Sequence, residues 1–210
     1  MKETDASLDA AYALQTPEDS VRLYGGWAQD YDRDFAAAHG YVFPAEVAKL
    51  FTERGSAAHA QVLDIGAGTG LVAEALPGVT IDGIDISAEM LAVAEAKGLY
   101  RRRIVADLTR PLQMIGDGAY SGFISTGTFT HGHVGPACLP ELMRIAAPGA
   151  LFVLGIKADA FDKAGFGSAF AMLVAERRIT PIDFASAPIY RGATHEHAAD
   201  RALVAVFHRR

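Results

Sequence analysis

From residue 61 onward, short apolar runs alternate with helical stretches, and this alternation limits the fold more than any other feature of the sequence. Strands are predicted at residues 62–65, 80–85, 103–106, 120–125 and 150–156. Helical patterns between or after them cover residues 71–76, 88–97 and 139–145. Strands that alternate with helices at this spacing form parallel units, and helices then cover both faces of the sheet. The sequence therefore predicts an α/β fold.

The two ends of the chain depart from this alternation. Residues 182–190 and 202–208 are predicted as strands with no helix between them, so they should form an antiparallel hairpin at the edge of the sheet. At the other end, Thr16 followed by a proline predicts a helix start. The glycine pair at 25 and 26 is expected to interrupt that helix, with a second helix over 27–39. Residues 1–45 are thus predicted as a helical extension, and residues 46–210 as the α/β domain.

A glycine-rich segment joins the first predicted strand to the first helix. Gly66, Gly68 and Gly70 lie in this segment, where a Cβ atom would block a close approach between backbone and ligand. Asp85 ends the second predicted strand and lies 19 residues after Gly66. Its carboxylate is suited to hold both hydroxyls of a ribose. These two features fit NAD as well as S-adenosylmethionine.

Three details favour S-adenosylmethionine over NAD. The third glycine comes one residue too early for the dinucleotide pattern, and Leu71 stands where that glycine should be. Asp64 would repel a pyrophosphate but attract the ammonium group of a methionine. Asp107, after the third strand, is suited to accept a hydrogen bond from an adenine amino group. Each aspartate alone could merely cap the next helix, but together they favour a cationic ligand that carries an adenosine.

On these motifs the chain resembles the class I S-adenosylmethionine-dependent methyltransferase superfamily over about residues 20–160. The resemblance implies a Rossmann-like, seven-stranded, mostly parallel sheet with an antiparallel strand in its C-terminal hairpin, and an N-terminal helical lid. Residues 24–32, 89–91 and 96–100 are also similar to the methyltransferase-like proteins of the Williams–Beuren region family. The motifs that carry the wider resemblance are residues 64–70, 84–87, 105–108, 123–126 and 147–150.

The resemblance also implies a set of cofactor-binding residues. Asp85 would bind the ribose hydroxyls, Asp107 the adenine amino group, and the main chain near Thr126 the methionine amine. Tyr24 and Tyr31 would close over the cofactor, although they could equally pack the lid onto the core. The full predicted set is Tyr24, Tyr31, Asp64, Gly66, Ala67, Gly68, Gly70, Asp85, Ile86, Asp107, Leu108 and Thr126.

The segment after the fourth strand says less about the methyl acceptor. Residues 125–133 lack the Asn/Asp-Pro-Pro-aromatic pattern of amino-methylating relatives, which argues against DNA-base or glutamine methylation of that type. His131 is the predicted general base, with His133 as second choice, and a histidine that only hydrogen-bonds within the loop is an equal alternative. Two His-x-His pairs, at 131/133 and 195/197, raise the question of a metal. Both fall in predicted loops without an accompanying carboxylate, so no metal is expected.

Composition narrows the range of partners. A net charge of −6 argues against nucleic acid, because binding phosphates needs a basic face. No apolar run approaches the about 20 residues that cross a bilayer. The only cysteine, Cys138, permits no internal disulfide, so a cytoplasmic location is expected. We therefore predict a methyltransferase that acts on a small molecule. The alternatives are a non-catalytic or non-methylating S-adenosylmethionine-binding protein, or an NAD-dependent oxidoreductase.

Overall fold

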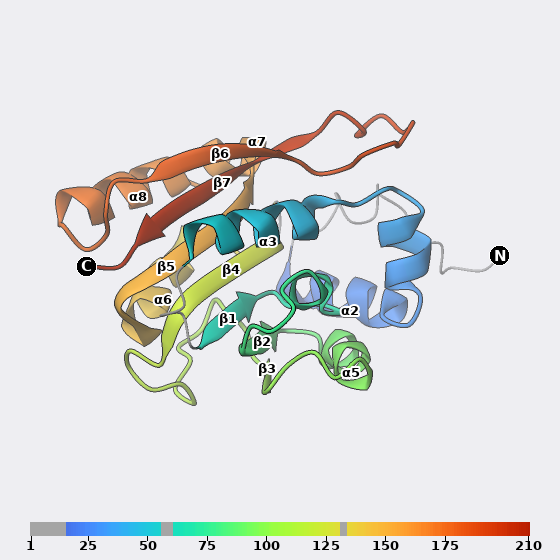
Figure 1. The fold of residues 1–210 in the computed structure, drawn as a ribbon, viewed down its shortest axis with the longest axis horizontal. Helices are drawn as coiled ribbons and strands as arrows, with labels where there is room; N and C mark the ends of the chain where they lie inside the picture. Colours follow the sequence, from blue (N-terminus) through green and yellow to red (C-terminus); the bar gives the residue numbers. More distant parts are fainter. Residues whose placement is uncertain (1–15, 56–60, 131–133) are drawn as a thin grey trace.

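The computed structural model describes residues 16–55, 61–130 and 134–210 (Figure 1). Its centre is a seven-stranded sheet with the strand order β3-β2-β1-β4-β5-β7-β6. Strands β1 to β5 pair in parallel, whereas β7 runs antiparallel to both β5 and β6. This topology confirms the predicted Rossmann-like fold. The strands are β1 Val62–Ile65, β2 Ile81–Asp85, β3 Arg103–Val105, β4 Tyr120–Phe129, β5 Ala146–Lys157, β6 Asp183–Pro188 and β7 Arg201–His208.

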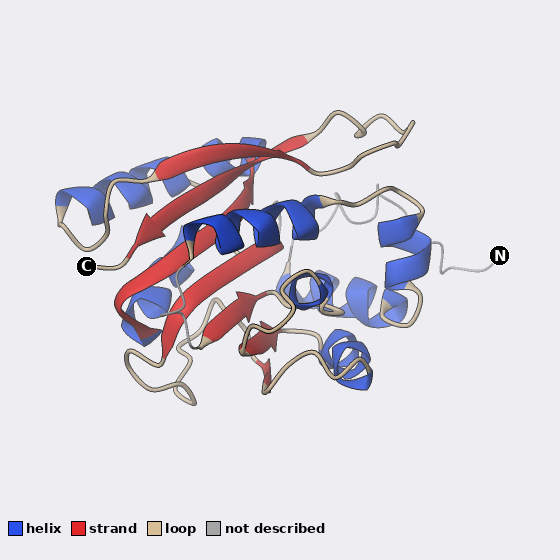
Figure 2. Cartoon of the chain, viewed as in Figure 1, coloured by secondary structure: helices blue, strands red, loops and turns tan. Residues whose placement is uncertain are grey.

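Helices lie on both sides of the sheet (Figure 2). Helix α3 crosses in front of the central strands in Figure 1, while α6 and α8 lie behind the sheet. Helix α5 packs beside β2 and β3 near the N-terminal helices. The helices are α2 Pro17–Trp27, α3 Phe43–Arg54, α4 Leu71–Glu74, α5 Ala88–Ala96, α6 Leu139–Ile145, α7 Ala158–Lys163 and α8 Phe166–Ala175, with a π-helix η1 at Tyr31–Ala37 and a 3-10 helix η2 at Pro136–Cys138.

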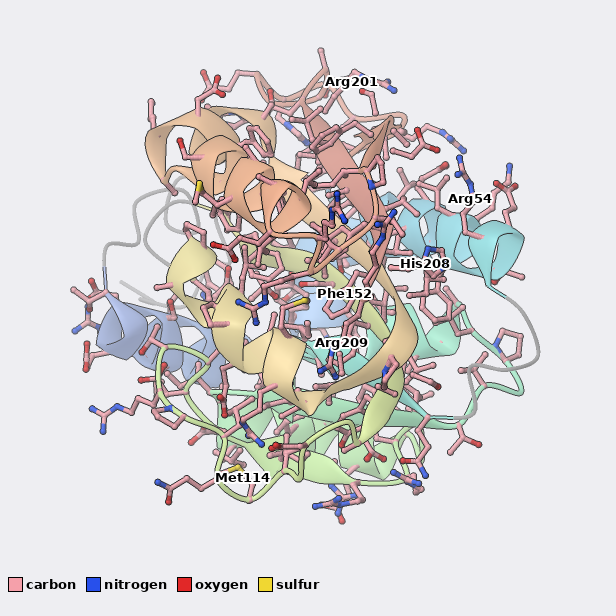
Figure 3. All side chains as sticks on the ribbon, turned by 90° about the vertical axis from the view of Figure 1, so that its left-hand side faces the viewer. Arg54, Met114, Phe152, Arg201, His208 and Arg209 are labelled. Carbon is pink, nitrogen blue, oxygen red and sulfur yellow. The ribbon has the colours of Figure 1, made fainter. Side chains whose placement is uncertain are left out.

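Neighbouring residues of β5 belong to two different hydrophobic cores, because side chains alternate between the faces of a strand. Leu151 and Val153 belong to the core that includes α3, whereas Phe152 and Leu154 belong to the core that includes α6 and α8. The ring of Phe152 stacks on that of Phe123, with centroids 4.2 Å apart. Figure 3 shows Phe152 near the middle of the molecule. The sheet is therefore buried on both faces, as parallel sheets require.

The described part of the predicted N-terminal extension, residues 16–45, differs from its prediction and is called the N-terminal segment below. Gly25 and Gly26 lie inside α2, which runs without interruption to Trp27, and the chain leaves the helix only after that residue. A Cβ atom on Gly25 would lie 3.4 Å from the Glu89 carboxylate of α5, so this face of α2 packs closely against a neighbour. Such packing can offset the about 1 kcal/mol that a glycine costs inside a helix.

The second predicted helix, residues 27–39, is present only as the π-helix η1. Its Phe35 and Ala36 are buried, and the stretch between Trp27 and Tyr31 is a turn. Helix α3 runs across the predicted boundary between residues 45 and 46, and the division of the chain at that boundary stays a prediction. None of the described helices is both long and apolar enough to span a bilayer.

Candidate active site

A cavity of about 940 Å³, counting space open to solvent, lies where β1, β2, β3 and β4 end. The carboxyl ends of parallel strands are the usual place for ligands in such sheets. The structure brings most of the predicted cofactor residues together here, although Asp64 and Gly70 do not line the cavity. The predicted residues that line it are Tyr24, Tyr31, Gly66, Ala67, Gly68, Asp85, Ile86, Asp107, Leu108 and Thr126.

Asp85 fixes the glycine-rich loop to the end of β2. Its Oδ2 accepts a hydrogen bond from the backbone N–H of Gly68, and its Oδ1 accepts one from Ser87, both at 2.8 Å. Burial raises the pKa of this carboxyl, and the backbone N–H groups of Ser87, Gly68 and Ile86 counteract part of that rise. A carboxylate has about four lone-pair sites, so beside these N–H groups it can still accept a hydroxyl donor.

The three glycines have different steric reasons to be glycine. A Cβ atom on Gly66 would lie 1.8 Å from the hydroxyl of Thr128 in β4, and one on Gly70 would lie 2.5 Å from Leu99. Both residues adopt positive φ, at +70° and +93°. Gly68 has more room, since the nearest atom to an added Cβ is the terminal methyl of Met90 at 3.5 Å. Two of the glycines therefore allow close packing within the protein, and only Gly68 both has space beside it and lines the cavity.

Asp64 lies beneath the glycine-rich loop and is fully buried. Its Oδ2 accepts a hydrogen bond from the Tyr100 hydroxyl at 2.6 Å, while its Oδ1 has no hydrogen-bond partner among the described residues. Burial raises the pKa of this carboxyl to about 7, although the bond from Tyr100 lowers it in part. Contact with a methionine ammonium stays a prediction. Sequence reasoning gave Tyr100 no role, although the residue falls within one of the quoted motifs.

Asp107 lines the cavity and also caps its own turn. Its Oδ1 accepts hydrogen bonds from the backbone N–H of Thr109 at 2.8 Å and from the hydroxyl of the same residue at 2.6 Å. The Nε of Arg110 lies 3.3 Å from its Oδ2. This is the local capping expected of an aspartate after a strand. A bond from Asp107 to an adenine amino group stays a prediction.

Two tyrosines of the N-terminal segment complete the wall of this cavity. Tyr24 comes from α2 and Tyr31 from the start of η1, and their rings meet edge to face with centroids 6.1 Å apart. The Tyr31 ring also stacks on Phe35 at 5.0 Å. Burial raises the pKa of both tyrosines well above the ordinary value, so their hydroxyls stay neutral.

Asp32 ties this segment to the glycine-rich loop. Its Oδ1 accepts a hydrogen bond from the hydroxyl of Thr69 at 2.5 Å, and its Oδ2 forms an ion pair with Lys97 after α5. The Lys97 ammonium also pairs with Glu74 at 2.7 Å. Burial lowers the pKa of Lys97, but the hydrogen bonds to both carboxylates outweigh burial and leave it raised. Sequence reasoning missed Asp32 as a site residue, although the residue ends the quoted segment 24–32.

A second cavity, of about 600 Å³ including space open to solvent, adjoins the first. Tyr24, Tyr31, Tyr41 and Gly127 line both cavities. Tyr41 is hydrogen-bonded to the side chain of Thr126. The prediction had β4 end at residue 125, but β5 continues alongside it and β4 extends to Phe129. The register slips between residues 125 and 129, and this irregular stretch forms the junction of the two cavities.

None of the described histidines lines either cavity. His131 and His133 lie outside the described residues, so the role of His131 as general base stays a prediction. The ring of His195 meets those of Tyr190 and His39 edge to face, at 4.8 and 5.3 Å. The Nδ1 of His197 lies 3.2 Å from the carboxylate of Asp200. Among the described residues, no group of three or more His, Cys, Asp or Glu side chains is arranged to hold a metal ion.

Residues 63–154, from β1 to β5, match the family model of a methyltransferase domain. The chain carries a class I methyltransferase domain. The human methyltransferase-like protein 27 is 32% identical over 159 residues, which cover 73% of this chain. The chain spans 64% of that relative, which is less than two thirds of its length.

Solved structures share the fold of this methyltransferase domain at low sequence identity. A TehB-like S-adenosylmethionine-dependent methyltransferase from Corynebacterium glutamicum superposes with a TM-score of 0.61 at 22% identity, over 89% of this chain and 98% of that one. The cyclase SpnF superposes with a TM-score of 0.66 at 15% identity, over 94% of this chain and 97% of its own. The predicted superfamily and fold are confirmed.

Methyltransferase domains of this class use S-adenosylmethionine, and the first cavity fits that molecule. Asp85, a partly buried acceptor, lines this cavity, and the open side of Gly68 leaves room for a ligand against the backbone. The buried Oδ1 of Asp64, which lacks a hydrogen-bond partner among the described residues, is an acceptor that a donor from a ligand or a water could satisfy. The prediction of S-adenosylmethionine as cofactor is confirmed, and NAD is set aside.

Proposed function

We propose that this protein transfers a methyl group from S-adenosylmethionine to a small-molecule acceptor. The observation that carries the proposal is the pair of adjoining cavities, because a methyltransferase must hold donor and acceptor side by side. Tyr24, Tyr31, Tyr41 and Gly127 form the shared wall.

In this proposal S-adenosylmethionine supplies a methyl group on a cationic sulfur. Asp85 accepts hydrogen bonds from the ribose hydroxyls, Asp107 binds the adenine, and the backbone near Thr126 meets the methionine amine. Tyr24 and Tyr31 of the N-terminal segment cover the cavity and exclude water from it. The division of the chain into a lid, residues 1–45, and a catalytic domain, residues 46–210, is part of this proposal.

The closer family assignment is also part of the proposal. Residues 24–32 carry the likeness to the Williams–Beuren region methyltransferases together with residues 89–91 and 96–100, and they run from the end of α2 to the start of η1. In this segment, Asp32 accepts a hydrogen bond from the glycine-rich loop. Tyr31 lines both cavities. The resemblance therefore falls on residues that bear on both ligands, rather than on residues of the core alone.

The main alternative is a protein that binds S-adenosylmethionine without transferring its methyl group. SpnF, described as a cyclase, shares this fold, so the fold alone does not determine the reaction. The second cavity supports methyl transfer because it provides an acceptor site next to the cofactor cavity. Formation of adenosylhomocysteine together with a methylated product separates the two possibilities.

The first experiment measures cofactor binding by calorimetry. S-adenosylmethionine and adenosylhomocysteine should bind the wild-type protein with micromolar affinity, whereas NAD should not. Asp85→Ala should weaken binding about 100-fold, because it removes a charged acceptor from the cavity wall. The matched control is Asp183→Ala at the sheet edge, whose exposed carboxylate pairs with Arg54. Absence of adenosylhomocysteine binding to the wild type would overturn the proposal.

The second experiment asks whether methyl transfer uses His131. Once an acceptor is found by mass spectrometry of a small-molecule panel, His131→Asn should lower turnover by about 100-fold if the imidazole is a general base. His197→Asn is the control, since the His197 ring lies near Asp200 and lines neither cavity. Unchanged turnover of the His131 variant would remove the base but leave methyl transfer itself in place.

A further inference from the structure

Aromatic residues make up the largest part of the wall of the second cavity. Seven of the thirteen described residues that line it are Phe or Tyr, and they come from the N-terminal segment, from β4 and from the chain just after β6. The Tyr31 and Phe35 rings are nearly parallel, with an angle of 16° between their planes. The centroids of the Tyr41 and Tyr190 rings lie 5.8 Å apart. A wall built from rings favours an occupant that is itself flat and largely apolar.

The wall that the two cavities share carries tyrosine hydroxyls. Three of the four residues that line both cavities are Tyr24, Tyr31 and Tyr41, and the fourth is Gly127. Burial raises the pKa of all three tyrosines above the ordinary value, so their hydroxyls stay neutral. In the proposed function the methyl donor and the acceptor meet at this wall. The atom that receives the methyl group therefore lies among neutral hydroxyls, which bind through hydrogen bonds.

The Tyr41 hydroxyl has a fixed position at this wall. It is hydrogen-bonded to the side chain of Thr126, and a Cβ atom on Gly127 would lie 3.3 Å from its oxygen. Gly127 has a φ of +77°, so a side chain there would be strained as well as crowded against Tyr41. The backbone of Tyr41 is held too, because it bridges to Tyr190 and its N–H donates to the Ala36 carbonyl at 2.9 Å.

The hydroxyl pair of Tyr41 and Thr126 has one proton to spare. Two hydroxyls hold two protons, and one of them makes the bond within the pair, whichever residue donates it. Among the described residues, no acceptor takes the other proton. Tyr41 lines the second cavity and Thr126 does not, so an acceptor bound there meets the proton of Tyr41, with Thr126 as the donor within the pair.

We propose that the second cavity binds an aromatic alcohol as the methyl acceptor, with its hydroxyl oxygen hydrogen-bonded to Tyr41. The inference rests on the proposed function, since it names the acceptor class for the same site. The oxygen has two lone pairs: one accepts the hydrogen bond from Tyr41, and the other attacks the methyl carbon. The oxygen–carbon bond forms as the carbon–sulfur bond breaks, the electron pair of the broken bond stays on sulfur, and the hydroxyl proton leaves to a base or to water.

An aromatic amine is the competing occupant, because it has the same flat body. Its nitrogen has a single lone pair, and a lone pair that accepts the proton of Tyr41 is not available to attack the methyl group. If the amine instead donates an N–H to the Tyr41 oxygen, the spare proton of the hydroxyl pair is left without an acceptor, which costs free energy in a buried site. The alcohol satisfies that proton and keeps a lone pair for the attack, so the hydrogen bonds favour oxygen.

The test uses 2-naphthol and three relatives that each change one feature. A methyl group replaces the hydroxyl in 2-methylnaphthalene, an amino group replaces it in 2-naphthylamine, and the rings are no longer flat in decahydro-2-naphthol. Binding to the full chain saturated with adenosylhomocysteine is measured by calorimetry, or by displacement of 2-naphthol where solubility is low. 2-Naphthol should bind about fivefold more tightly than each relative, as expected for one neutral hydrogen bond or for lost ring contacts.

Two variants test the role of the Tyr41 hydroxyl. Tyr41→Phe keeps the ring and should lower the affinity for 2-naphthol to that for 2-methylnaphthalene. The preference for 2-naphthol over decahydro-2-naphthol should remain, and adenosylhomocysteine affinity should stay within about twofold. Tyr120→Phe is the matched control, because it removes a hydroxyl that donates to Asp82 outside both cavities. It should leave the ratios among the four probes unchanged.

Several results would overturn the inference: no binding of any probe, equal binding of 2-naphthol and decahydro-2-naphthol, a preference for the amine, or a Tyr41→Phe variant that still prefers 2-naphthol to 2-methylnaphthalene. Loss of adenosylhomocysteine binding in Tyr41→Phe would do the same, because it would assign this hydroxyl to the cofactor. Each of these results leaves the proposed function standing. Failure of adenosylhomocysteine to bind the wild-type protein overturns that function itself.

Discussion

The two cavities adjoin, but the chain builds them in different ways. The cofactor cavity comes mainly from the ends of four neighbouring strands, and its shape depends on backbone conformation at glycines and on the partly buried carboxylate of Asp85. The second cavity comes from side chains of four segments that lie far apart in the sequence: residues 24–43, 127–130, 155–157 and 189–202. The first can therefore be retained across a family while the second changes with the residues that dock around it.

The N-terminal segment is where the two cavities depend on each other. Asp32 holds it to the glycine-rich loop, while the backbone of Tyr41 pairs with Tyr190 near the hairpin. The Arg191 N–H also donates to the Gly40 carbonyl at 2.8 Å. One segment thus contacts the glycine-rich loop of the cofactor cavity through a carboxylate and lines the second cavity with aromatic rings. Substitutions that affect one side alone test whether the two cavities are separable.

The largest expected effect concerns the steric design of the cofactor cavity. Gly66→Ala places a methyl group 1.8 Å from the Thr128 hydroxyl, at a φ of +70°. Gly118→Ala is the matched control, since its φ of +65° is similar but its nearest neighbour would lie at 3.8 Å. The control should cost about 1 kcal/mol of unfolding free energy, and Gly66→Ala about 3 kcal/mol more, with loss of adenosylhomocysteine binding. Urea unfolding measures the difference, and equal costs would show that close approach of β4 is not what requires this glycine.

The next effect concerns Asp64 and the pH dependence of stability. The pKa of this buried carboxyl is raised to about 7 in the folded protein, whereas the pKa of an aspartate in the unfolded chain is about 3.9. Between these values the folded state holds a proton that the unfolded state has released, so stability should fall as pH rises from about 4 to about 7. The slope from this one group is at most about 1.4 kcal/mol per pH unit.

Asp64→Asn removes that titration while its amide oxygen can still accept the Tyr100 hydrogen bond. The difference in unfolding free energy between variant and wild type should therefore grow in favour of the variant across this pH range. Asp183→Asn, a change of the same kind at an exposed ion pair, should give a curve parallel to the wild type. Parallel curves for Asp64→Asn would mean that the buried carboxyl titrates normally.

The contrast between the cavities also explains what the sequence could predict. The strands and the glycine-rich loop follow from local patterns: apolar runs, a serine cap at Ser87 and glycines at fixed spacing. The continuation of α2 through Gly25 could not be predicted, because it depends on packing against Glu89 of α5. The extension of β4 beyond residue 125 has no apolar signature, since that stretch contains threonines and a glycine, and pairing with β5 supplies what the local pattern lacks.

Most residues that line the second cavity could not be named from the sequence, for the same reason. Tyr41, Lys157 and Tyr190 carry no mutual spacing in the sequence, and only the docking of the N-terminal segment against the hairpin region brings them together. Asp32 and Lys97 are likewise distant in the sequence and meet only in the fold. Among the predicted cofactor residues, Asp64 is encoded by the motif but lies under the loop rather than on the cavity wall. Sequence patterns identify strand ends well and side-chain juxtaposition poorly.

An intermediate effect tests whether the second cavity can be altered without affecting the cofactor cavity. Tyr190 lines the second cavity and not the first, and its backbone bridge to Tyr41 does not depend on the side chain. Tyr190→Leu should weaken binding of the methyl acceptor about 10-fold through loss of ring contacts, while adenosylhomocysteine affinity stays within about twofold. Calorimetry with each ligand gives both numbers. A similar loss for both ligands would break the comparison, because it would show that the cavities behave as one unit.

The smallest expected effect concerns Asp32, which links the N-terminal segment to the glycine-rich loop. Asp32→Asn keeps the size of the side chain but removes the charge that pairs with Lys97 and accepts from Thr69. The N-terminal segment should then dock less firmly, and adenosylhomocysteine affinity should fall about fivefold, as for a partly buried ion pair. Arg33→Met on the same π-helix is the control, because its ion pairs with Asp30 and Asp34 are exposed to solvent.

Trp27, the only tryptophan of the chain, reports on the same docking. It is buried in α2 and meets Tyr24 edge to face at 5.9 Å, so its fluorescence should shift to longer wavelength if the segment loosens. A red shift in Asp32→Asn that adenosylhomocysteine reverses would show that cofactor binding and docking stabilise each other. The second cavity, which the same segment lines, would then be completed only after the cofactor is bound. A red shift with unchanged cofactor affinity would instead place the whole effect of Asp32 on the acceptor side, and the cofactor cavity would stand independently of the segment that covers it.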